Sequence, residues 1–341
     1  MTNSQLIEEA IAGDERAFAE LVAPHRRPLQ AHCYRMLGSL QDAEDAVQET
    51  LLRAWRNLSS FQRRSSLRTW LYTIATNVCL RLMERRPSRV LPIDYGPAAD
   101  PHEPLREPLL ESVWIEPYPD ERLGLDDGPA GPEARYEQRE SIELAFVAAL
   151  QLLPARQRAV LMLRDVLGFS GAEVAEALDT TPASVYSALQ RAHATMEERR
   201  PDRTQQATLR ALGDEQQQAI VARYVEAWAD DDVDTLVGML TDTATLAMPP
   251  IPSWYRGRAA IERVLRSVVF DGKRSWRMVP TAANGQLAVG AYELDSSGVY
   301  APHGVTVLTL RGGLIDEISH FRTPSMVERF GLSLQAGSDA G

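Results

Sequence analysis

The sequence predicts a multidomain protein in which two all-α helical domains precede an α+β domain. A chain of 341 residues is longer than one ordinary domain, so more than one hydrophobic core is expected. Apolar residues recur at helical spacing through 3–86 and 133–199, and a proline-rich segment separates the two stretches. Alternating strand-like runs follow in the last third of the chain. We therefore expect domains at 1–89, 133–200 and 213–332, with a linker at 90–132.

The first domain is predicted to be helical throughout. Apolar spacing indicates a helix over 3–23 that is interrupted near Gly13, and a further helix over 28–37 that ends at Gly38, a residue suited to a left-handed C-cap. The stretch DAEDAVQETLLRAW (42–55) opens with acidic residues, which favour a helix N-terminus. A long helix over 67–86 is ended by Pro87.

Residues 90–132 are predicted to form an acidic, extended or irregular linker. Ten of the 21 prolines lie between residues 87 and 132, and residues 90–139 contain four Arg against twelve Asp and Glu. Proline is excluded from helix interiors, so regular helix is not expected here. The part 109–123 is expected to dock elsewhere on the protein, because Trp114, Ile115 and Tyr118 should not be left exposed.

The second helical domain ends in a predicted helix-turn-helix. Helices are expected over 133–153, 155–167, 171–178 and 182–199. Ser170 and Glu173 form a capping box, LDTT makes the turn, and Thr181 is an N-cap followed by proline. An ordinary helical pair is the alternative, but the complete cap-turn-cap pattern favours docking in a DNA groove. The outward residues suited to base or phosphate contacts are Ser184, Tyr186, Ser187, Gln190 and Arg191.

The last third is predicted to combine helices and strands. Helices are expected over 215–230 and 232–240, and the RGG sequence at 311–313 predicts a hairpin between two alternating runs. The expected strands are 243–248, 274–280, 287–294, 303–313 and 314–322.

Composition excludes several classes of protein. The N-terminus lacks the pattern of a signal peptide, and no stretch approaches the ~18 apolar residues of a membrane span, so a cytoplasmic protein without a membrane partner is expected. Cys33 and Cys79 are expected to be buried thiols, and the six histidines are dispersed, so neither a metal site nor a cofactor is expected. The net charge of −11 argues against DNA binding by electrostatics alone, although residues 61–89 hold seven Arg against one Glu.

Three motifs, in this order and separation, resemble the extracytoplasmic function (ECF) sigma factors of bacterial RNA polymerase. DAEDAVQETLLRAW resembles their helix that binds the polymerase clamp helices. FQRRSSLRTWLYTIATNVCLRLMERR (61–86) resembles their segment that melts and reads the −10 promoter element. LPARQRAVLMLRDVLGFSGAEVAEALDTTPASVYSALQRAH (153–193) is similar to their −35-reading region. The resemblance implies core polymerase, through its clamp helices and flap, and promoter DNA as partners.

The resemblance also implies roles for individual residues. For polymerase binding it indicates Asp42, Glu44, Asp45, Gln48, Glu49, Leu52 and Trp55. For −10 reading and melting, which need aromatic, amide and Arg groups around an unstacked base, it indicates Phe61, Arg63, Arg64, Ser65, Ser66, Arg68, Trp70, Asn77, Arg81 and Arg85. Two interpretations of residues 90–108 remain open. This acidic segment either threads through basic channels of the polymerase or serves as a solubilising spacer.

The C-terminal third resembles SnoaL-like domains, a cone-shaped α+β fold, through WYRGRAAIERVL (254–265) and the paired strands after it. Such folds enclose a pocket, whose candidate residues here are Tyr224, Trp228, Met248, Trp254, Tyr255, His303 and His320. No catalytic spacing is found, so we expect no catalytic residues and no enzyme. We expect the domain to modulate the sigma regions in cis through an intramolecular contact. The alternatives are a SnoaL-type enzyme or small-ligand sensor fused to a DNA-binding module, and a stand-alone repressor.

Overall fold

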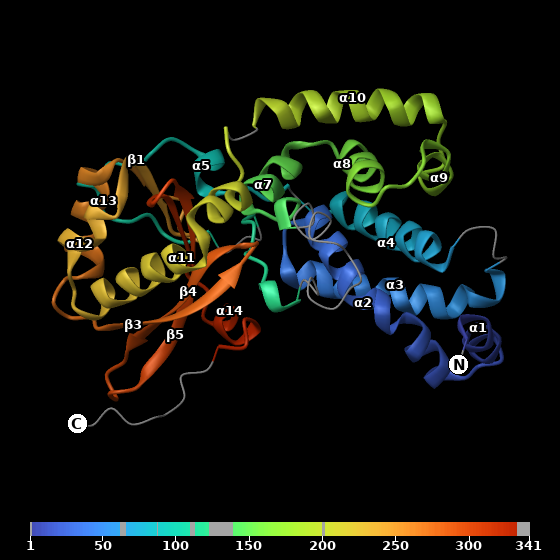
Figure 1. The fold of residues 1–341 in the computed structure, drawn as a ribbon, viewed down its shortest axis with the longest axis horizontal. Coiled ribbons are helices and arrows are strands. Elements are labelled where there is room, and N and C mark those ends of the chain that lie inside the picture. Colours follow the sequence, from blue (N-terminus) through green and yellow to red (C-terminus); the bar gives the residue numbers. More distant parts are fainter. Residues whose placement is uncertain are drawn as a thin grey trace. The chain divides into compact units, whose positions relative to one another are not determined.

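The computed structural model describes residues 2–61, 66–86, 88–109, 113–122, 139–199 and 202–332. The chain forms two compact units (Figure 1). The helical unit contains residues 1–89 and 122–200, and the C-terminal unit contains residues 90–121 and 201–341. The segment between the two predicted helical domains is therefore divided, and its larger part packs with the α+β domain.

Over its described residues, the N-terminal half of the helical unit contains four α-helices with well-defined caps. They are α1 (Asn3–Ile11), α2 (Glu15–Leu37), α3 (Leu40–Asn57) and α4 (Leu67–Met83), and a short 3-10 turn, η1 (Leu58–Ser60), follows α3. Side chains of Thr2, Asp14, Ser39 and Ser66 cap the four N-termini. Gly38, with φ of 68°, ends α2 as predicted.

The prediction of a separate helix over 28–37 is wrong, because α2 runs unbroken through Pro24 and Pro28. Each internal proline removes a backbone hydrogen bond. The helix continues because Leu29 and every residue from Ala31 to Leu37 are buried, and α2 packs against α3 and α4. Tertiary packing outweighs the local preference here.

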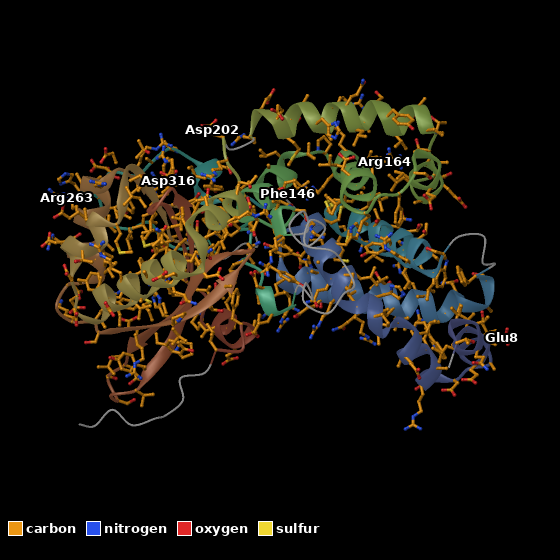
Figure 2. The ribbon with its side chains drawn as sticks, in the orientation of Figure 1. Glu8, Phe146, Arg164, Asp202, Arg263 and Asp316 are labelled. Atoms are coloured by element: carbon orange, nitrogen blue, oxygen red, sulfur yellow. The ribbon has the colours of Figure 1, made fainter. Side chains whose placement is uncertain are left out.

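The second half of the helical unit contains the predicted helix-turn-helix. It comprises α7 (Leu144–Leu152), α8 (Ala155–Leu161) with a π-helical continuation η3 (Met162–Val166), α9 (Gly171–Ala177) and α10 (Pro182–Glu198). The capping box of Ser170 and Glu173 is present, and Thr181 caps α10. Arg164, labelled in Figure 2, donates a hydrogen bond to the carbonyl of Phe169 in the turn before α9. Residues 133–138 of the predicted helix over 133–153 lie outside the described residues.

Arg158 in α8 holds the two halves of the helical unit together. Its side chain is only 2% exposed and donates hydrogen bonds to the carbonyl of Met36, at the end of α2. Further bonds run to the side-chain oxygen of Gln151 (2.5 Å), the carbonyl of Gln151 (3.0 Å) and the carbonyl of Leu153 (3.2 Å). Burial lowers the pKa of Arg158 to about 10, so the guanidinium stays charged at neutral pH.

The C-terminal unit is built on a six-stranded sheet in the order β2-β1-β6-β5-β4-β3, in which β1 and β6 are parallel and the other neighbours antiparallel. The helix α11 (Gln205–Ala229), kinked at Gly213, packs along β3, β4 and β5 (Figure 1). The strands are β1 (Leu240–Ala247), β2 (Trp254–Arg256), β3 (Trp276–Ala283), β4 (Gln286–Leu294), β5 (Tyr300–Arg311) and β6 (Leu314–Phe321). The helices α12 (Val233–Gly238), α13 (Arg258–Val264) with its π-helical end η4 (Leu265–Val269), and α14 (Pro324–Arg329) complete the unit.

Three features of the sheet follow from glycine and asparagine residues in the sequence. The predicted hairpin at 311–313 joins β5 to β6, with Gly312 at φ 62°. A second hairpin joins β3 to β4 through Asn284 and Gly285, whose φ values of 56° and 69° suit an Asn-Gly turn. Gly304 lies where the two strands β5 and β6 approach closely, since a Cβ there would be 2.2 Å from the carbonyl oxygen of Phe321.

The described linker residues, 90–109 and 113–121, pack with the C-terminal unit. After a short helix, α5 (Pro92–Tyr95), the chain continues to a 3-10 turn, η2 (Asp120–Arg122). Trp114, Ile115 and Tyr118 are 6%, 0% and 0% exposed, which agrees with the expectation that this part docks. The backbone N–H of Tyr118 donates to the side-chain oxygen of Asn284 (2.8 Å), and the N–H of Asn284 donates to the carbonyl of Tyr118 (2.9 Å). The linker is thus anchored on the β3–β4 turn.

We predict that Arg158→Leu lowers the free energy of unfolding of the helical unit by about 3 kcal/mol, because several buried carbonyl groups lose their donor together. Urea denaturation followed by circular dichroism at helical wavelengths measures this loss. The matched control is Arg156→Leu, an exposed position on the same helix, for which a change within about 0.5 kcal/mol is expected. Equal losses in the two variants would contradict a structural role specific to Arg158.

Candidate functional site

The exposed face of α3 carries three of the residues predicted to bind polymerase. Asp45, Gln48 and Leu52 are exposed and follow one another at helical spacing, so they share one face. The Leu52 side chain is 43% exposed between polar neighbours. We call Asp45, Gln48 and Leu52 the α3 face.

The other predicted residues of this helix have partners within the helical unit. Glu44 and Glu49 are half-buried and form ion pairs with Arg122 and Arg53. Trp55 is half-buried and packs on Phe18, with ring centroids 5.0 Å apart. Trp55 therefore contributes to the small hydrophobic cluster around α1.

Asp42 does not lie on the α3 face. It is 5% exposed and forms ion pairs with Arg86 and, at 2.8 Å, with Arg89, which is itself buried. Burial raises the pKa of Asp42, but the hydrogen bonds from Arg86 and Arg89 outweigh this effect and leave the pKa below its ordinary value. Asp42 is thus a buried structural carboxylate, and its position in the acidic stretch 42–49 did not reveal this because its partners are more than 40 residues away in sequence.

A cleft of about 330 Å³ brings together three of the residues predicted to read the −10 element: Trp70, Asn77 and Arg81. They come from one side of α4. The opposite wall comes from the end of α3 and η1, and sequence reasoning did not include its residues. The remaining lining residues are Arg53, Asn57, Ser60, Thr73 and Ile74.

Among the residues that the structure describes, the other predicted −10 residues do not line this cleft. Phe61 and Trp70 pack together at 5.0 Å between ring centroids, and Ser66 serves as the N-cap of α4. Arg85 is exposed beyond the end of α4. Arg63, Arg64 and Ser65 lie outside the described residues.

Two predicted DNA-binding side chains are engaged by the helix-turn-helix half of the same unit. The Asn77 amide donates to the carbonyl of Ala177, at the end of α9 (3.2 Å). Arg68 donates to the carbonyl of Leu167 (3.1 Å) and lies over the rings of Tyr72 and Phe169 at 5.2 and 5.3 Å. The helical unit is therefore closed over part of its own candidate −10 site.

The second helix of the helix-turn-helix presents its predicted contact residues to solvent. Ser184, Tyr186, Ser187, Gln190 and Arg191 are all exposed on α10. The Arg191 guanidinium donates to the hydroxyl of Ser187 (2.7 Å), so Ser187 orients Arg191 along this face. The hydroxyl of Tyr186 lies above Gly171, where an added Cβ would be 3.1 Å away, so Tyr186 also packs against the start of α9.

The C-terminal unit contains an apolar pocket between its sheet and the helices α11, α12 and η4. Five of the predicted pocket residues line it, and sequence reasoning missed the linker residue Leu105 and the strand residue Trp276. The predicted residues that line the pocket are Tyr224, Trp228, Met248, His303 and His320. Its polar end also includes Arg274, Thr306 and Arg322.

Trp254 and Tyr255 were predicted to line this pocket, and that prediction is wrong. Trp254 donates its indole N–H to the carbonyl of Gly96 in the linker (2.7 Å). Tyr255 is 1% exposed within the hydrophobic core. Both residues belong to the edge strand β2, which faces the linker and the core and does not reach the pocket lining.

A chain of hydrogen bonds runs through the polar end of the pocket. His320 Nδ1 is 2.8 Å from Thr306 Oγ1, and His320 Nε2 is 3.0 Å from His303 Nδ1. Burial lowers the pKa of His303 to about 4. The pKa of His320 is held well below 6.5 by burial and by repulsion from His303 and Arg322. Both imidazoles are therefore neutral at pH 7, and each has one donor and one acceptor nitrogen.

The chain is similar to known proteins in each of its parts. Family models match residues 21–88 (Sigma-70 region 2), residues 143–196 (Sigma-70, region 4) and residues 221–318 (SnoaL-like domain). The ECF RNA polymerase sigma factor SigG of Mycobacterium tuberculosis is 43% identical over 323 residues, which are 94% of this chain and 85% of SigG. The chain belongs to the ECF RNA polymerase sigma factors. As such it binds core RNA polymerase and promoter DNA and directs promoter-specific initiation.

Two further proteins are similar to this sigma factor, one in sequence and one in structure. SigM of M. tuberculosis is 28% identical over 195 residues, which are 57% of this chain and 83% of SigM. The crystal structure of the M. tuberculosis sigma factor SigJ has the same fold, with a TM-score of 0.55 and 22% identity over 89% of this chain and 95% of that chain. The fused α+β domain of this sigma factor is thus SnoaL-like in sequence family and in fold.

Within the described ranges of this sigma factor, no helix has the length and apolar character needed to cross a membrane. Over the same residues, no group of three or more His, Cys, Asp or Glu side chains could hold a metal ion. Cys33 and Cys79 are both buried free thiols, as predicted.

We predict that Asp42→Asn destabilises the helical unit by about 3 kcal/mol, because Arg86 and Arg89 lose the carboxylate that they share. Since the folded-state pKa of Asp42 is depressed, its contribution is present above pH 4 and is lost as pH falls through that folded-state value. Urea denaturation measures the loss. The control Asp45→Asn should leave stability within about 0.5 kcal/mol and weaken binding to core polymerase in a pull-down. The reverse pattern would show that Asp42 belongs to the polymerase-binding surface.

We predict that the C-terminal unit loses stability as pH falls from 6.5 towards 4. The unfolded histidines bind protons near pH 6.5, whereas the folded pKa of His303 is about 4 and that of His320 is also depressed, so acid favours the unfolded state. Calorimetric melting between pH 7 and 4.5 should give a smaller decrease for a His303→Gln, His320→Gln double variant. Identical decreases in the two proteins would show that this pair is not responsible.

Proposed function

We propose that this sigma factor binds core polymerase through the α3 face, reads the −10 element with the cleft on α4, and reads the −35 element with α10. The convergence of Trp70, Asn77 and Arg81 on one cleft carries this assignment, because an unstacked base needs an aromatic surface, an amide and a cation together. Ser187, Gln190 and Arg191 supply hydrogen-bonding groups on an exposed recognition helix. The polymerase supplies most of the affinity, which explains how an acidic chain reads DNA.

The closed arrangement of the helical unit is part of this proposal. Asn77 cannot give its amide to a base while it donates to Ala177, and Arg68 is held by the turn before α9. Core polymerase therefore has to separate the two halves of the helical unit before the −10 cleft is fully available. The hydrogen bonds of Arg158 are then among the interactions that oppose this separation.

The SnoaL-like domain modulates these steps in cis, through an intramolecular contact with the sigma regions, and is not an enzyme in this proposal. Neutral histidines with depressed pKa values are weak bases, and the pocket is narrow. The protein acts in the cytoplasm, where core polymerase and promoter DNA are found. Point variants are preferable to deletion of the domain as tests, because deletion would expose Trp114, Ile115 and Tyr118 of the linker.

We predict separable promoter defects in the two reading surfaces. Transcription by reconstituted holoenzyme from templates randomised at −35 or at −10, followed by transcript sequencing, measures base preference at each element. Ser187→Ala with Gln190→Ala should reduce −35 discrimination by about tenfold, since a good base contact contributes about 1–3 kcal/mol. Asn77→Ala should reduce −10 discrimination and leave −35 preference unchanged. Glu198→Ala, at the exposed end of α10, is the control without effect on either.

The assignment would be wrong if Ser187→Ala with Gln190→Ala altered −10 preference, or if these variants lost core polymerase in a pull-down. The α3 face is tested in the same pull-down with Leu52→Asp, which should abolish binding because a buried charge would replace an apolar contact. Retention of core binding by Leu52→Asp would exclude the α3 face as the contact.

A further inference from the structure

One wall of the SnoaL-like pocket is supplied by the linker. Leu105 lines the pocket and is half-buried against the hydrophobic core of the domain. The residues around it, 96–109, are held at both ends. Gly96 accepts from the Trp254 indole (2.7 Å), and Leu109 donates its backbone N–H to the carbonyl of Pro250 (2.9 Å). We call residues 96–109 the strap.

The pocket has little free space while Leu105 is in place. Its cavity volume is about 50 Å³, enough for a few water molecules, whereas pockets for organic ligands usually have about 300–1,000 Å³. An organic ligand of ordinary size therefore requires part of the lining to move, and Leu105 is the lining residue that the linker contributes.

The lining of the pocket favours a ligand with an apolar body and an anionic group. Trp228, Trp276 and Met278 contribute to its apolar walls, and Arg274 and Arg322 lie with the histidine pair at its polar end. Aromatic walls suit a planar ring system, and a guanidinium suits a carboxylate or sulfonate.

Arg322 forms no direct ion pair in the part of the chain that the structure describes. Arg274 lies 3.5 Å from Glu293, but no carboxylate lies within ion-pair distance of Arg322 among the described residues. Partial burial and the nearby Arg274 lower the pKa of Arg322, and the more distant Glu293 offsets only part of this effect. An anionic group in the pocket would balance the charge of Arg322.

We propose that the SnoaL-like pocket binds a small aromatic organic anion, and that Leu105 of the strap competes with this ligand for the same space. Ligand binding then releases the strap from the domain. The exposed carboxylates of Asp100, Glu103 and Glu107 move with it, so the ligand changes the position of an acidic segment between the two sigma regions.

Release of the strap leaves the rest of the linker in place. Val90 pairs with the linker segment that follows the strap. The backbone N–H of Val90 donates to the carbonyl of Val113 (2.8 Å), and the N–H of Ile115 donates to the carbonyl of Val90 (3.1 Å). The bonds between Tyr118 and Asn284 form a second anchor. The strap is therefore a loop closed at its base, and it can leave the pocket without unfolding the linker.

The test uses anilinonaphthalene sulfonate, an aromatic sulfonate that fluoresces in apolar sites, titrated into the purified full chain. Leu105→Ala should bind the probe about tenfold more tightly than the wild type, because the competing side chain is shortened. Leu314→Ala, an exposed leucine of the same unit outside the pocket lining, is the matched control and should leave the affinity unchanged. Unchanged affinity in Leu105→Ala would overturn the competition.

The anion requirement is tested in the Leu105→Ala background. Adding Arg322→Gln should reduce probe affinity about tenfold, and Arg322→Lys should restore part of it. Phenylnaphthylamine, which has the same aromatic body without the sulfonate, should bind with no dependence on Arg322. Equal affinity of the sulfonate for the Gln variant would overturn the anion site. A near-ultraviolet dichroism spectrum like that of the wild type separates pocket binding from probe adsorption to a loosened domain.

Strap release is measured in the wild-type chain by trypsin cleavage after the exposed Arg106, identified by mass spectrometry. Saturating probe should accelerate this cleavage severalfold, and no acceleration would contradict release. The effect on transcription rests on the proposed function, but probe binding and cleavage do not involve polymerase. If the proposed polymerase- and promoter-binding surfaces were wrong, the probe-binding and cleavage results would still hold. If probe binding or cleavage failed, the proposed surfaces would be unaffected.

Discussion

The packing of linker residues 90–121 on the SnoaL-like domain is the constraint on which the rest of this sigma factor depends. The chain leaves the helical unit after Arg89, follows the C-terminal unit, and returns at Arg122 before it builds the helix-turn-helix. The two sigma regions are thus joined through a segment whose conformation the third domain determines. A change in how the domain holds this segment would alter part of the covalent connection between the two sigma regions, which is the route by which the proposed modulation in cis would act.

The helical unit is closed by hydrogen bonds that engage two residues of the proposed −10 site, Asn77 and Arg68. Arg158 satisfies carbonyl groups from α2 and from the end of α7, while Asn77 and Arg68 bond to backbone carbonyls beside α9. Each bond contributes modestly, because all of these groups could bond to water instead. The two halves also share apolar contacts, such as Phe169 on Tyr72 with ring centroids 6.0 Å apart, so their proposed separation would also expose apolar surface.

Local sequence was sufficient for the elements with local causes. The caps at Ser170 and Thr181 and the glycines at 312 and 313 act within a few residues, so the helix-turn-helix and the β5–β6 hairpin were predictable. Asp42 was assigned to an exposed surface because its partners Arg86 and Arg89 are distant in sequence. Leu105 was missed for a related reason: a proline-rich segment has no periodicity, so nothing in the sequence shows which side chain it inserts into another domain. Five pocket residues were found because pocket chemistry limits the residue types: Tyr224, Trp228, Met248, His303 and His320.

The β3–β4 turn has a consequence for how this protein can vary. Asn284 and Gly285 adopt left-handed backbone conformations that make the hairpin, and the same two residues bond to Tyr118 and to the carboxylate of Asp120. Most two-residue turns accept Gly or Asp in place of Asn. Gly has no side-chain oxygen to accept from the Tyr118 N–H, and Asp would introduce a negative charge at this point. The residue type at position 284 is therefore limited by two requirements: the turn between β3 and β4, and the hydrogen bonds to the linker. In homologues, we therefore expect substitutions at position 284 to occur together with substitutions at 118–120, as they do at the contact between two interacting proteins.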